Sequence, residues 1–327
     1  MNGSLMEHKE LYPWLINDYK RLVSLTIANK IQSVIIHGHE GVGIDNLVDY
    51  WCKYLLCSSV GLSDGFACNI CKSCVLFSYN NHPDYYKLQP MNQDKMITAE
   101  SVRTMIDYLY LSTNYDKYKI IQIDNSDLLN DTSSNVLLKV LETPPNYAIF
   151  IIKSFNLKNI LPTILSRCIK LNIKKPNTTI AYNHLKDRNV KNIQFWLDFS
   201  YNSPLCEIQI EDDTLQQFID VLIKPNTDSI YSLLQLLNSQ DVKYSFILNF
   251  INKWITDLVC YKLTQKLNFF NTYINSINTM INSLDIEKIF YLQSNLLLLV
   301  KFQYHPLNTK LQLENILYQY SNSIKHK

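Results

Sequence analysis

The chain has 327 residues, of which 47% are hydrophobic and 18% are charged. Because a single hydrophobic core rarely grows beyond roughly 250–300 residues, this length predicts two or three domains, and the composition excludes a disordered chain or a fibrous repeat. The net charge of +2 is spread evenly, with 16 basic and 16 acidic residues in 1–171 and 15 and 13 in 172–327. This distribution argues against a protein that binds DNA alone through a basic surface, so any nucleic-acid contact is expected to be shared with partners.

The sequence carries no membrane signal. Its apolar runs are far shorter than the roughly 18 residues that a membrane-spanning helix needs. The first ten residues, MNGSLMEHKE, lack the basic stretch followed by an apolar one that marks a secretory signal peptide. We therefore expect a soluble, cytoplasmic protein.

The first half of the chain alternates short apolar runs with amphipathic stretches, which is typical of strands separated by helices. The amphipathic stretches predict a helix over about 45–57, a helix capped by Thr98, and a helix from a cap at Asp131 to Leu141. Because the apolar runs are apolar throughout, we expect a parallel sheet that is covered by helices on both faces. The predicted strands are residues 33–38, 84–88, 119–124, 148–153 and 168–173.

The second half of the chain is predicted to be helical, because the strand pattern stops near residue 172. Two long helices, over about 241–266 and 285–304, are apolar on more than one face. Such helices bury the extra face either against another chain or in a core of their own domain. The predicted organisation is an α/β domain at 1–171 with a metal module at 57–74, a small helical domain at 172–207 and a helical oligomerisation domain at 208–327.

Four of the eight cysteines form a cluster with the spacing of a metal site. Ten, two and two residues separate Cys57, Cys68, Cys71 and Cys74. Four thiolates that converge as a tetrahedron favour Zn²⁺, and a site closed by four protein ligands is structural. His82 is assigned to a turn and is not needed as a further ligand. The alternatives are an iron–sulfur cluster and a cysteine-rich loop with free thiols.

The segment after the first predicted strand has the glycine spacing of a phosphate-binding loop but lacks its chemistry. An active loop, GxxxxGK[ST], needs a lysine for the β- and γ-phosphates and a hydroxyl for Mg²⁺. Gly38 and Gly43 have the required spacing. However, Ile44 replaces the lysine and Asp45 replaces the hydroxyl residue. An aliphatic side chain cannot neutralise phosphate and a carboxylate repels it, so we expect a degenerate site that neither hydrolyses nor tightly binds a nucleotide.

The end of the third predicted strand supports the same interpretation. Asp124 is followed by Asn125, where a hydrolytic site of this class would have a glutamate that positions the attacking water. Asparagine cannot act as a base. We expect Asp124 to cap the next turn rather than to bind Mg²⁺, and Ser154 to be a structural hydroxyl.

Several sequence blocks, taken in order, resemble the delta-prime family of bacterial DNA polymerase III clamp-loader subunits. They cover about residues 30–171, and their order and spacing are more specific than any single block. One departure is Glu142-Thr143, where the family usually has two glutamates. The blocks are the cysteine cluster, HPDY at 82–85, the strand that ends at Asp124, NxxLKxLExPP at 135–145 and LPTIxSRC at 161–168. Outside this region, NTKLQLENIL at 308–317 resembles the closing helix of that family.

The resemblance implies an AAA+ α/β domain, a helical lid domain and a helical collar domain. It implies a ring with ATP-hydrolysing gamma or tau subunits and a delta subunit, which loads the sliding clamp onto primed DNA during replication. This chain would be the member with the defective nucleotide site. The arginine of the SRC motif, Arg167, would reach across a subunit interface and stabilise the charge on the γ-phosphate of a neighbour's ATP.

Two other functions compete with this interpretation. An ATP-hydrolysing subunit of the gamma type would need Lys-Ser or Lys-Thr in place of Ile44-Asp45. A stand-alone zinc-containing protein that binds nucleic acid would be expected to have a basic surplus. The sequence disfavours both.

Overall fold

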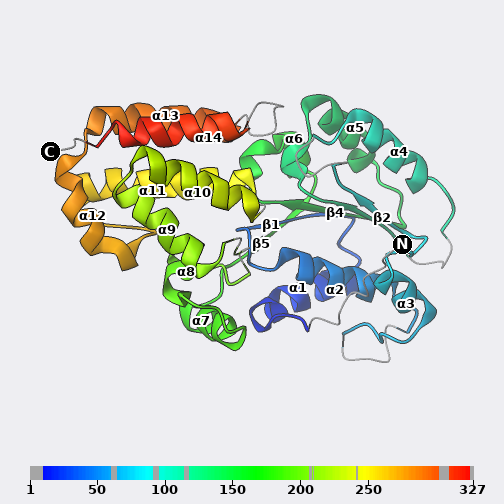
Figure 1. The fold of residues 1–327 in the computed structure, drawn as a ribbon. Helices are drawn as coiled ribbons and strands as arrows, with labels where there is room; N and C mark the ends of the chain where they lie inside the picture. The colour runs from blue at the N-terminus through cyan, green and yellow to red at the C-terminus, as the bar shows by residue number, and fades with distance from the viewer. Residues whose placement is uncertain are drawn as a thin grey trace. The chain divides into compact units, whose positions relative to one another are not determined.

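The structure is a computed structural model that describes residues 10–59, 65–90, 96–113, 118–205, 208, 210–240, 242–301 and 309–324. The chain divides into two compact units, Met1–Pro176 and Asn177–Lys327 (Figure 1). The first unit contains a five-stranded sheet, and the described part of the second is built mainly from helices. The predicted fold class, an α/β domain with a parallel sheet followed by a helical part, is confirmed.

The first unit is organised around a parallel sheet with the strand order β2-β3-β4-β1-β5. Its strands are β1 (Ser33–Gly38), β2 (Tyr85–Leu88), β3 (Lys119–Ile123), β4 (Ala148–Ser154) and β5 (Ile169–Ile173). All neighbouring strands in this order run parallel. Every residue of β3 and β4 is buried, as continuous apolar runs predict for central strands covered on both faces. The five predicted strands are therefore confirmed.

Helices cover both faces of this sheet. Successive residues of a strand point to opposite faces, so neighbouring residues of β1 pack into different cores. Ile36 of β1 belongs to a core that it shares with α1 and α2, whereas Ile35 belongs to a second core with α4 and α5. Figure 1 shows these two pairs of helices on opposite sides of the sheet. The helices of this unit are α1 (Ile16–Ile27), α2 (Ile44–Leu56), α3 (Lys72–Ser78), α4 (Ala99–Leu109), α5 (Asp131–Glu142) and α6 (Pro162–Leu165).

The starts of α4 and α5 test the two predicted helix caps. Thr98 caps α4 as predicted, since its hydroxyl accepts a hydrogen bond from the backbone N–H of Ser101 at 3.2 Å. The predicted cap at Asp131 is wrong. Asn130 caps α5 instead, because its side-chain oxygen accepts from the N–H of Ser133 at 2.7 Å.

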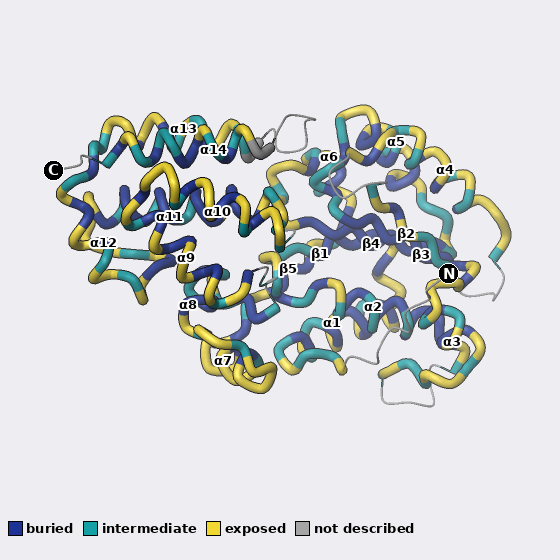
Figure 2. Tube along the Cα trace, in the orientation of Figure 1, coloured by how far each residue is buried: buried dark blue, intermediate teal, exposed yellow. Residues whose placement is uncertain are grey.

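The second unit consists of helices packed around one large core, with buried residues on their inner faces (Figure 2). α7 and α8 also share a small separate core, and their assignment to a lid domain at 172–207 remains a prediction. The unit contains α7 (Thr178–Asp187), α8 (Ile193–Phe199), α9 (Asp212–Ile223), α10 (Thr227–Ser239), α11 (Tyr244–Thr264), α12 (Ile274–Met280), α13 (Ile286–Lys301) and α14 (Thr309–Ser321).

The two long helices predicted for this unit correspond to α11 and α13, and the predicted closing segment corresponds to α14. Residues 241, 302–304 and 308 of those predictions lie outside the described residues. α11 buries most of its apolar residues in the core of its own unit, whereas α13 leaves both Tyr291 and Leu298 more than half exposed. Within the described residues, no helix is long and apolar enough to cross a membrane.

Candidate functional site

The glycines in and just before the loop between β1 and α2 lie at positions that disfavour a side chain. Gly41 and Gly43 adopt left-handed φ angles of 77° and 95°, which residues with a side chain rarely adopt. A Cβ atom at Gly38 would lie 2.9 Å from the carbonyl oxygen of Ile173 on the neighbouring strand. These constraints explain why the glycine spacing is present although the phosphate-binding side chains are not.

The two positions that carry the chemistry of an active loop have other contacts in this chain. Ile44 is only 3% exposed and packs in the core formed by α1, α2 and one face of the sheet. Asp45 is exposed, and its carboxylate accepts a hydrogen bond from the ammonium group of Lys153 on β4. These two positions therefore offer a phosphate no cation.

The segment before α1 holds the loop in place through direct contacts. The indole N–H of Trp14 donates to the carbonyl oxygen of Val42 at 2.9 Å. The backbone N–H of Tyr12 donates to the side chain of Asn46 at 3.2 Å, and the rings of Tyr12 and Trp14 are stacked. Contacts within the chain thus fix the loop without a bound nucleotide.

Lys153 lies at the centre of an ion-pair network beside this loop. Its ammonium group pairs with Asp45 and, at 2.8 Å, with the carboxylate of Asp124 at the end of β3. Lys87 pairs with the other oxygen of Asp124 at 2.9 Å, and the amide of Gln122 donates to the same carboxylate at 2.8 Å. The side chains of Lys153 and Asp124 are only 5% and 11% exposed. Asp124 therefore forms ion pairs, and the expectation that it caps the next turn is wrong.

The network shifts the pKa values of Asp124 and Lys153 in the directions that stabilise their charged forms. Burial acts to raise the pKa of Asp124, but the ammonium groups of Lys153 and Lys87 outweigh it and hold the pKa below its ordinary value. Burial acts to lower the pKa of Lys153, and the carboxylates of Asp45 and Asp124 outweigh it and raise the pKa. Because its folded pKa lies below the unfolded value, Asp124 contributes stability at neutral pH that is lost as the pH falls through the folded pKa.

Replacing Lys153 with alanine is expected to lower the free energy of unfolding by about 3 kcal/mol at pH 7. The change leaves the buried carboxylate of Asp124 without its most buried partner, which is costly even though Lys87 remains. The loss should be smaller at pH 5, because a carboxylate that has lost its partner protonates more readily. Denaturant unfolding followed by circular dichroism measures both values. The exposed Lys158→Ala is the matched control, and equal stabilities of Lys153→Ala and the control would contradict the prediction.

Asn125 and Ser154 have structural contacts. Asn125 adopts a φ of 51°, which asparagine tolerates, and its carbonyl oxygen accepts from the N–H of Leu128 at 2.8 Å. Ser154 is fully buried, and its hydroxyl donates to the carboxylate of Asp127 at 2.8 Å. The same carboxylate accepts from the N–H of Phe155 at 2.8 Å. These bonds hold the turns that follow β3 and β4, as expected of a structural hydroxyl at Ser154.

The four clustered cysteines converge although they come from different segments. Cys57 follows α2, Cys68 and Cys71 precede α3, and Cys74 lies in α3. Their sulfur atoms all lie within 4.8 Å of one another, and three of the pairs are 3.5, 3.9 and 4.0 Å apart. In a tetrahedral site with Zn–S bonds of about 2.3 Å, the sulfur atoms are about 3.8 Å apart. The cluster therefore has the geometry to hold a metal ion.

Buried polar side chains connect this cysteine module to the sheet. The hydroxyl of Ser73 donates to the carbonyl oxygen of Leu56 at 2.6 Å and lies 2.6 Å from Nε2 of His82. Nδ1 of His82 accepts from the N–H of Asp84 at 3.1 Å, so the proton of the neutral ring is assigned to Nε2. His82 thus links α3 to the start of β2. For Ser73, the sequence carries no signal of this role beyond the position of the residue between Cys71 and Cys74.

Arg167 lies at the amino edge of the sheet, opposite to the glycine-rich loop. It precedes β5, which pairs Ile169 with Val34 near the start of β1 and Ile173 with Gly38 at its end. The four residue steps along β5 span about 13 Å at 3.3 Å per residue. More than this length separates Arg167 from the loop of its own chain.

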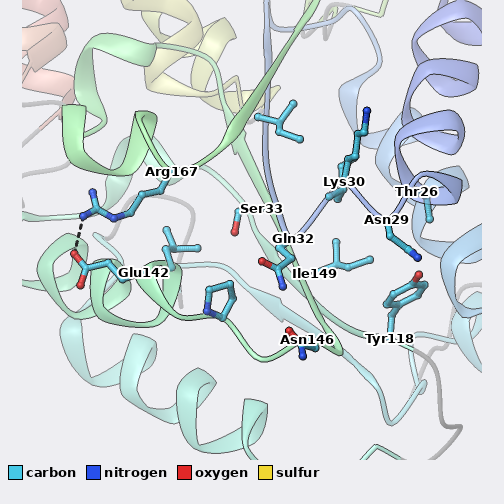
Figure 3. Close-up of a pocket in the computed structure, with 14 residues that line it drawn as sticks. Thr26, Asn29, Lys30, Gln32, Ser33, Tyr118, Glu142, Asn146, Ile149 and Arg167 are labelled. Carbon is cyan, nitrogen blue, oxygen red and sulfur yellow. Dashed lines mark hydrogen bonds and ion pairs between the residues drawn. The ribbon is translucent and has the colours of Figure 1, made fainter.

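A cavity of about 680 Å³ is present at this amino edge of the sheet, and Arg167 lines it (Figure 3). The guanidinium group donates from Nη2 to the carboxylate of Glu142 at 2.7 Å and from Nη1 to the carbonyl oxygen of Thr163 at 2.9 Å. In Figure 3, Arg167 and Glu142 lie on one side of the cavity, while Lys30 lies on the other. The arginine side chain is 35% exposed, so it remains accessible from outside the unit.

Comparison with known proteins finds relatives along most of the chain. A family model described as DNA polymerase III, delta subunit, matches residues 17–177. The DNA polymerase III subunit delta' of Buchnera aphidicola subsp. Baizongia pistaciae is 27% identical over an alignment of 294 residues, which covers 85% of this chain and 83% of that protein. The chain is thus similar to the DNA polymerase III delta-prime family over most of its length.

Other relatives match about half of the chain. The subunit delta' of Yersinia pestis is 32% identical over 171 residues, which are 52% of this chain and 50% of that protein. The DNA polymerase III subunit gamma of the same Buchnera aphidicola subspecies is 29% identical over 177 residues, which are 52% of this chain and 46% of that protein. The chain thus shares similarity with two subunit types of one polymerase, and the first relative extends it over most of both units.

Proposed function

We propose that this chain is the non-catalytic delta-prime subunit of a DNA polymerase III clamp loader. It assembles in the cytoplasm in a ring with gamma or tau and delta subunits. Through its effect on a neighbour's ATP site it helps to load the sliding clamp onto primed DNA during replication. Similarity to the delta-prime family supports this role, as does similarity to a protein named for the gamma subunit of the same polymerase.

The observation that carries the proposal is the ammonium group of Lys153 between two carboxylates beside the glycine-rich loop. In P-loop ATPases, the loop hydroxyl and the aspartate at a strand end hold Mg²⁺. Here the loop position is Asp45, and both it and Asp124 are already neutralised by a cation of the chain itself. Ile44 is buried where the phosphate-binding lysine would stand. The site therefore lacks the groups that ATP hydrolysis requires.

The position of Arg167 supports a role at the ATP site of another subunit. It lies on the sheet edge away from its own glycine-rich loop, is partly exposed and lines a cavity. A planar, permanently charged guanidinium can donate two hydrogen bonds to the γ-phosphate of a neighbour as charge develops in the transition state.

The four cysteines would hold one structural Zn²⁺. Their sulfur distances fit a tetrahedral ion, and four thiolates leave no open coordination position for substrate or water. The module lies between α2 and β2, and the bonds of Ser73 and His82 tie it to the sheet. We assign the metal a bracing role.

Residues 208–327 would form the helical collar through which the subunits assemble. The outer face of α13 supports this assignment, because it exposes large apolar side chains that a core would otherwise bury. The partners named here rest on the family and on the gamma-subunit relative.

Reconstitution tests the proposal and separates it from the alternatives. The isolated chain should show no ATP turnover above background, while adding it to gamma and delta subunits should yield a larger complex with higher clamp- and DNA-stimulated ATPase activity. Failure to join that complex in gel filtration would overturn the proposal. Turnover by the isolated chain would point to a gamma-type subunit instead, and tight DNA binding by the isolated chain would point to a stand-alone nucleic-acid-binding protein.

A further inference from the structure

Two N–H donors of the Arg167 guanidinium group form hydrogen bonds within the first unit. One N–H of Nη2 donates to Glu142 and one N–H of Nη1 donates to the carbonyl oxygen of Thr163. Guanidinium carries five N–H donors in a rigid plane. Three of them are not used by these two bonds, which fix the plane of the fork while leaving donors for a further acceptor.

Stability alone does not explain the ion pair between Glu142 and Arg167. The two side chains are 53% and 35% exposed, and ion pairs this accessible contribute about 0–1 kcal/mol. Glu142 is also the last residue of α5, where the negative end of the helix dipole disfavours a carboxylate. A glutamate at this position is therefore better explained by its partner than by the helix that carries it.

The backbone that follows Glu142 has little conformational freedom. Thr143 follows it as the C-cap of α5, and then come Pro144 and Pro145, whose rings fix the backbone φ angle. Pro144 lines the same cavity as Arg167 and Glu142. The carboxylate is thus presented at the rim of the cavity by a helix end with little freedom.

We propose that Glu142 is a positioning residue for Arg167, which orients the guanidinium fork toward the γ-phosphate of the neighbouring subunit's ATP. The inference rests on the proposed function, in which Arg167 acts in trans. Orientation of the fork before the neighbour's nucleotide arrives removes part of the ordering that the transition state would otherwise require. The carboxylate accepts only one of the five N–H donors, so the others remain available for phosphate oxygens.

The test compares variants of this chain in the reconstituted complex, with the difference between the unmodified chain and Arg167→Ala taken as the arginine-dependent ATPase activity. Glu142→Ala is expected to reduce this activity about fivefold, the size of effect that loss of one hydrogen bond brings. Glu142→Gln should retain most of it, because the amide oxygen still accepts from Nη2. The loss should appear in kcat and not in the KM for ATP, because the contact acts in the transition state. Glu100→Ala, another exposed glutamate of the first unit, is the matched control.

Combining Glu142→Ala with Arg167→Ala separates the outcomes. If Glu142 acts only through Arg167, the double variant should equal Arg167→Ala alone. Full activity of Glu142→Ala, or a further loss in the double variant, would overturn the positioning role while leaving the trans role of Arg167 intact. An Arg167→Ala complex as active as the unmodified one would instead overturn the proposed function. Thermal unfolding and gel filtration of each variant must match the unmodified chain, and a loss of folding or assembly in Glu142→Ala that explains its activity would also reject the inference.

Discussion

Replacing Arg167 with alanine is expected to slow ATP hydrolysis at the neighbouring subunit's site by about 10³–10⁵-fold in the reconstituted complex. The γ-phosphate gains charge in the transition state, and a guanidinium that reaches it from the next subunit is placed to neutralise that charge. Only the site that faces this chain should be affected, so the total stimulated ATPase activity of the ring should fall by the share of that site. Single-turnover measurement of the stimulated complex shows this as loss of one kinetic phase.

The variants of Arg167 should leave folding and assembly unchanged, because the side chain is partly exposed and forms two hydrogen bonds within the described residues. Arg167→Lys should recover only part of the rate, since it keeps the charge but loses the planar fork. Arg103→Ala, an exposed arginine on α4, provides a matched loss of charge elsewhere in the first unit. Equal stimulated ATPase and clamp-loading rates for Arg167→Ala and Arg103→Ala would reduce Arg167 to an ordinary surface residue.

Protein purified without chelators is expected to contain one zinc per chain, and Cys71→Ser is expected to lose it. Structural Zn²⁺ binds zinc-finger peptides with about 10–16 kcal/mol at neutral pH, so loss of one thiolate removes most of the energy that orders a small metal module. The segment around α3 should then become sensitive to proteolysis, while the parallel sheet remains folded. Elemental analysis gives the metal content, and limited proteolysis followed by mass spectrometry locates the cleavage.

Cys260→Ser provides the control for the zinc prediction, because Cys260 lies in the second unit outside the cluster. It should keep the zinc and the protease resistance of the unmodified chain. Iron in place of zinc would support the alternative of an iron–sulfur cluster. Neither metal in freshly purified protein, together with an intact α3 segment, would show that the four thiols are free.

Much of the fold and of the candidate chemistry could be predicted from the sequence, because these features depend on residues that are close in the chain. The strand over 148–153 is a continuous apolar run, and such runs indicate a strand buried on both faces. The loop glycines and the replacement of the phosphate-binding lysine by Ile44 can likewise be recognised from residues that are close in the chain. The two-residue spacing of Cys68, Cys71 and Cys74 predicts convergence for the same reason, and the structure brings these sulfur atoms together. The cap at Asn130 was missed because neighbouring Asn and Asp residues both suit that position.

The contacts that decide how the candidate sites work depend on the tertiary structure. Lys153 and Asp45 are 108 positions apart, and they meet only because β4 and β1 are neighbours in the sheet and end at the same edge. Glu142 and Arg167 meet because the end of α5 comes close to the segment before β5. A sequence pattern records the periodicity of one element at a time, whereas strand order and register determine which distant side chains share a sheet edge. For this reason the sequence predicts the degenerate loop but not the lysine that pairs with Asp45 and Asp124.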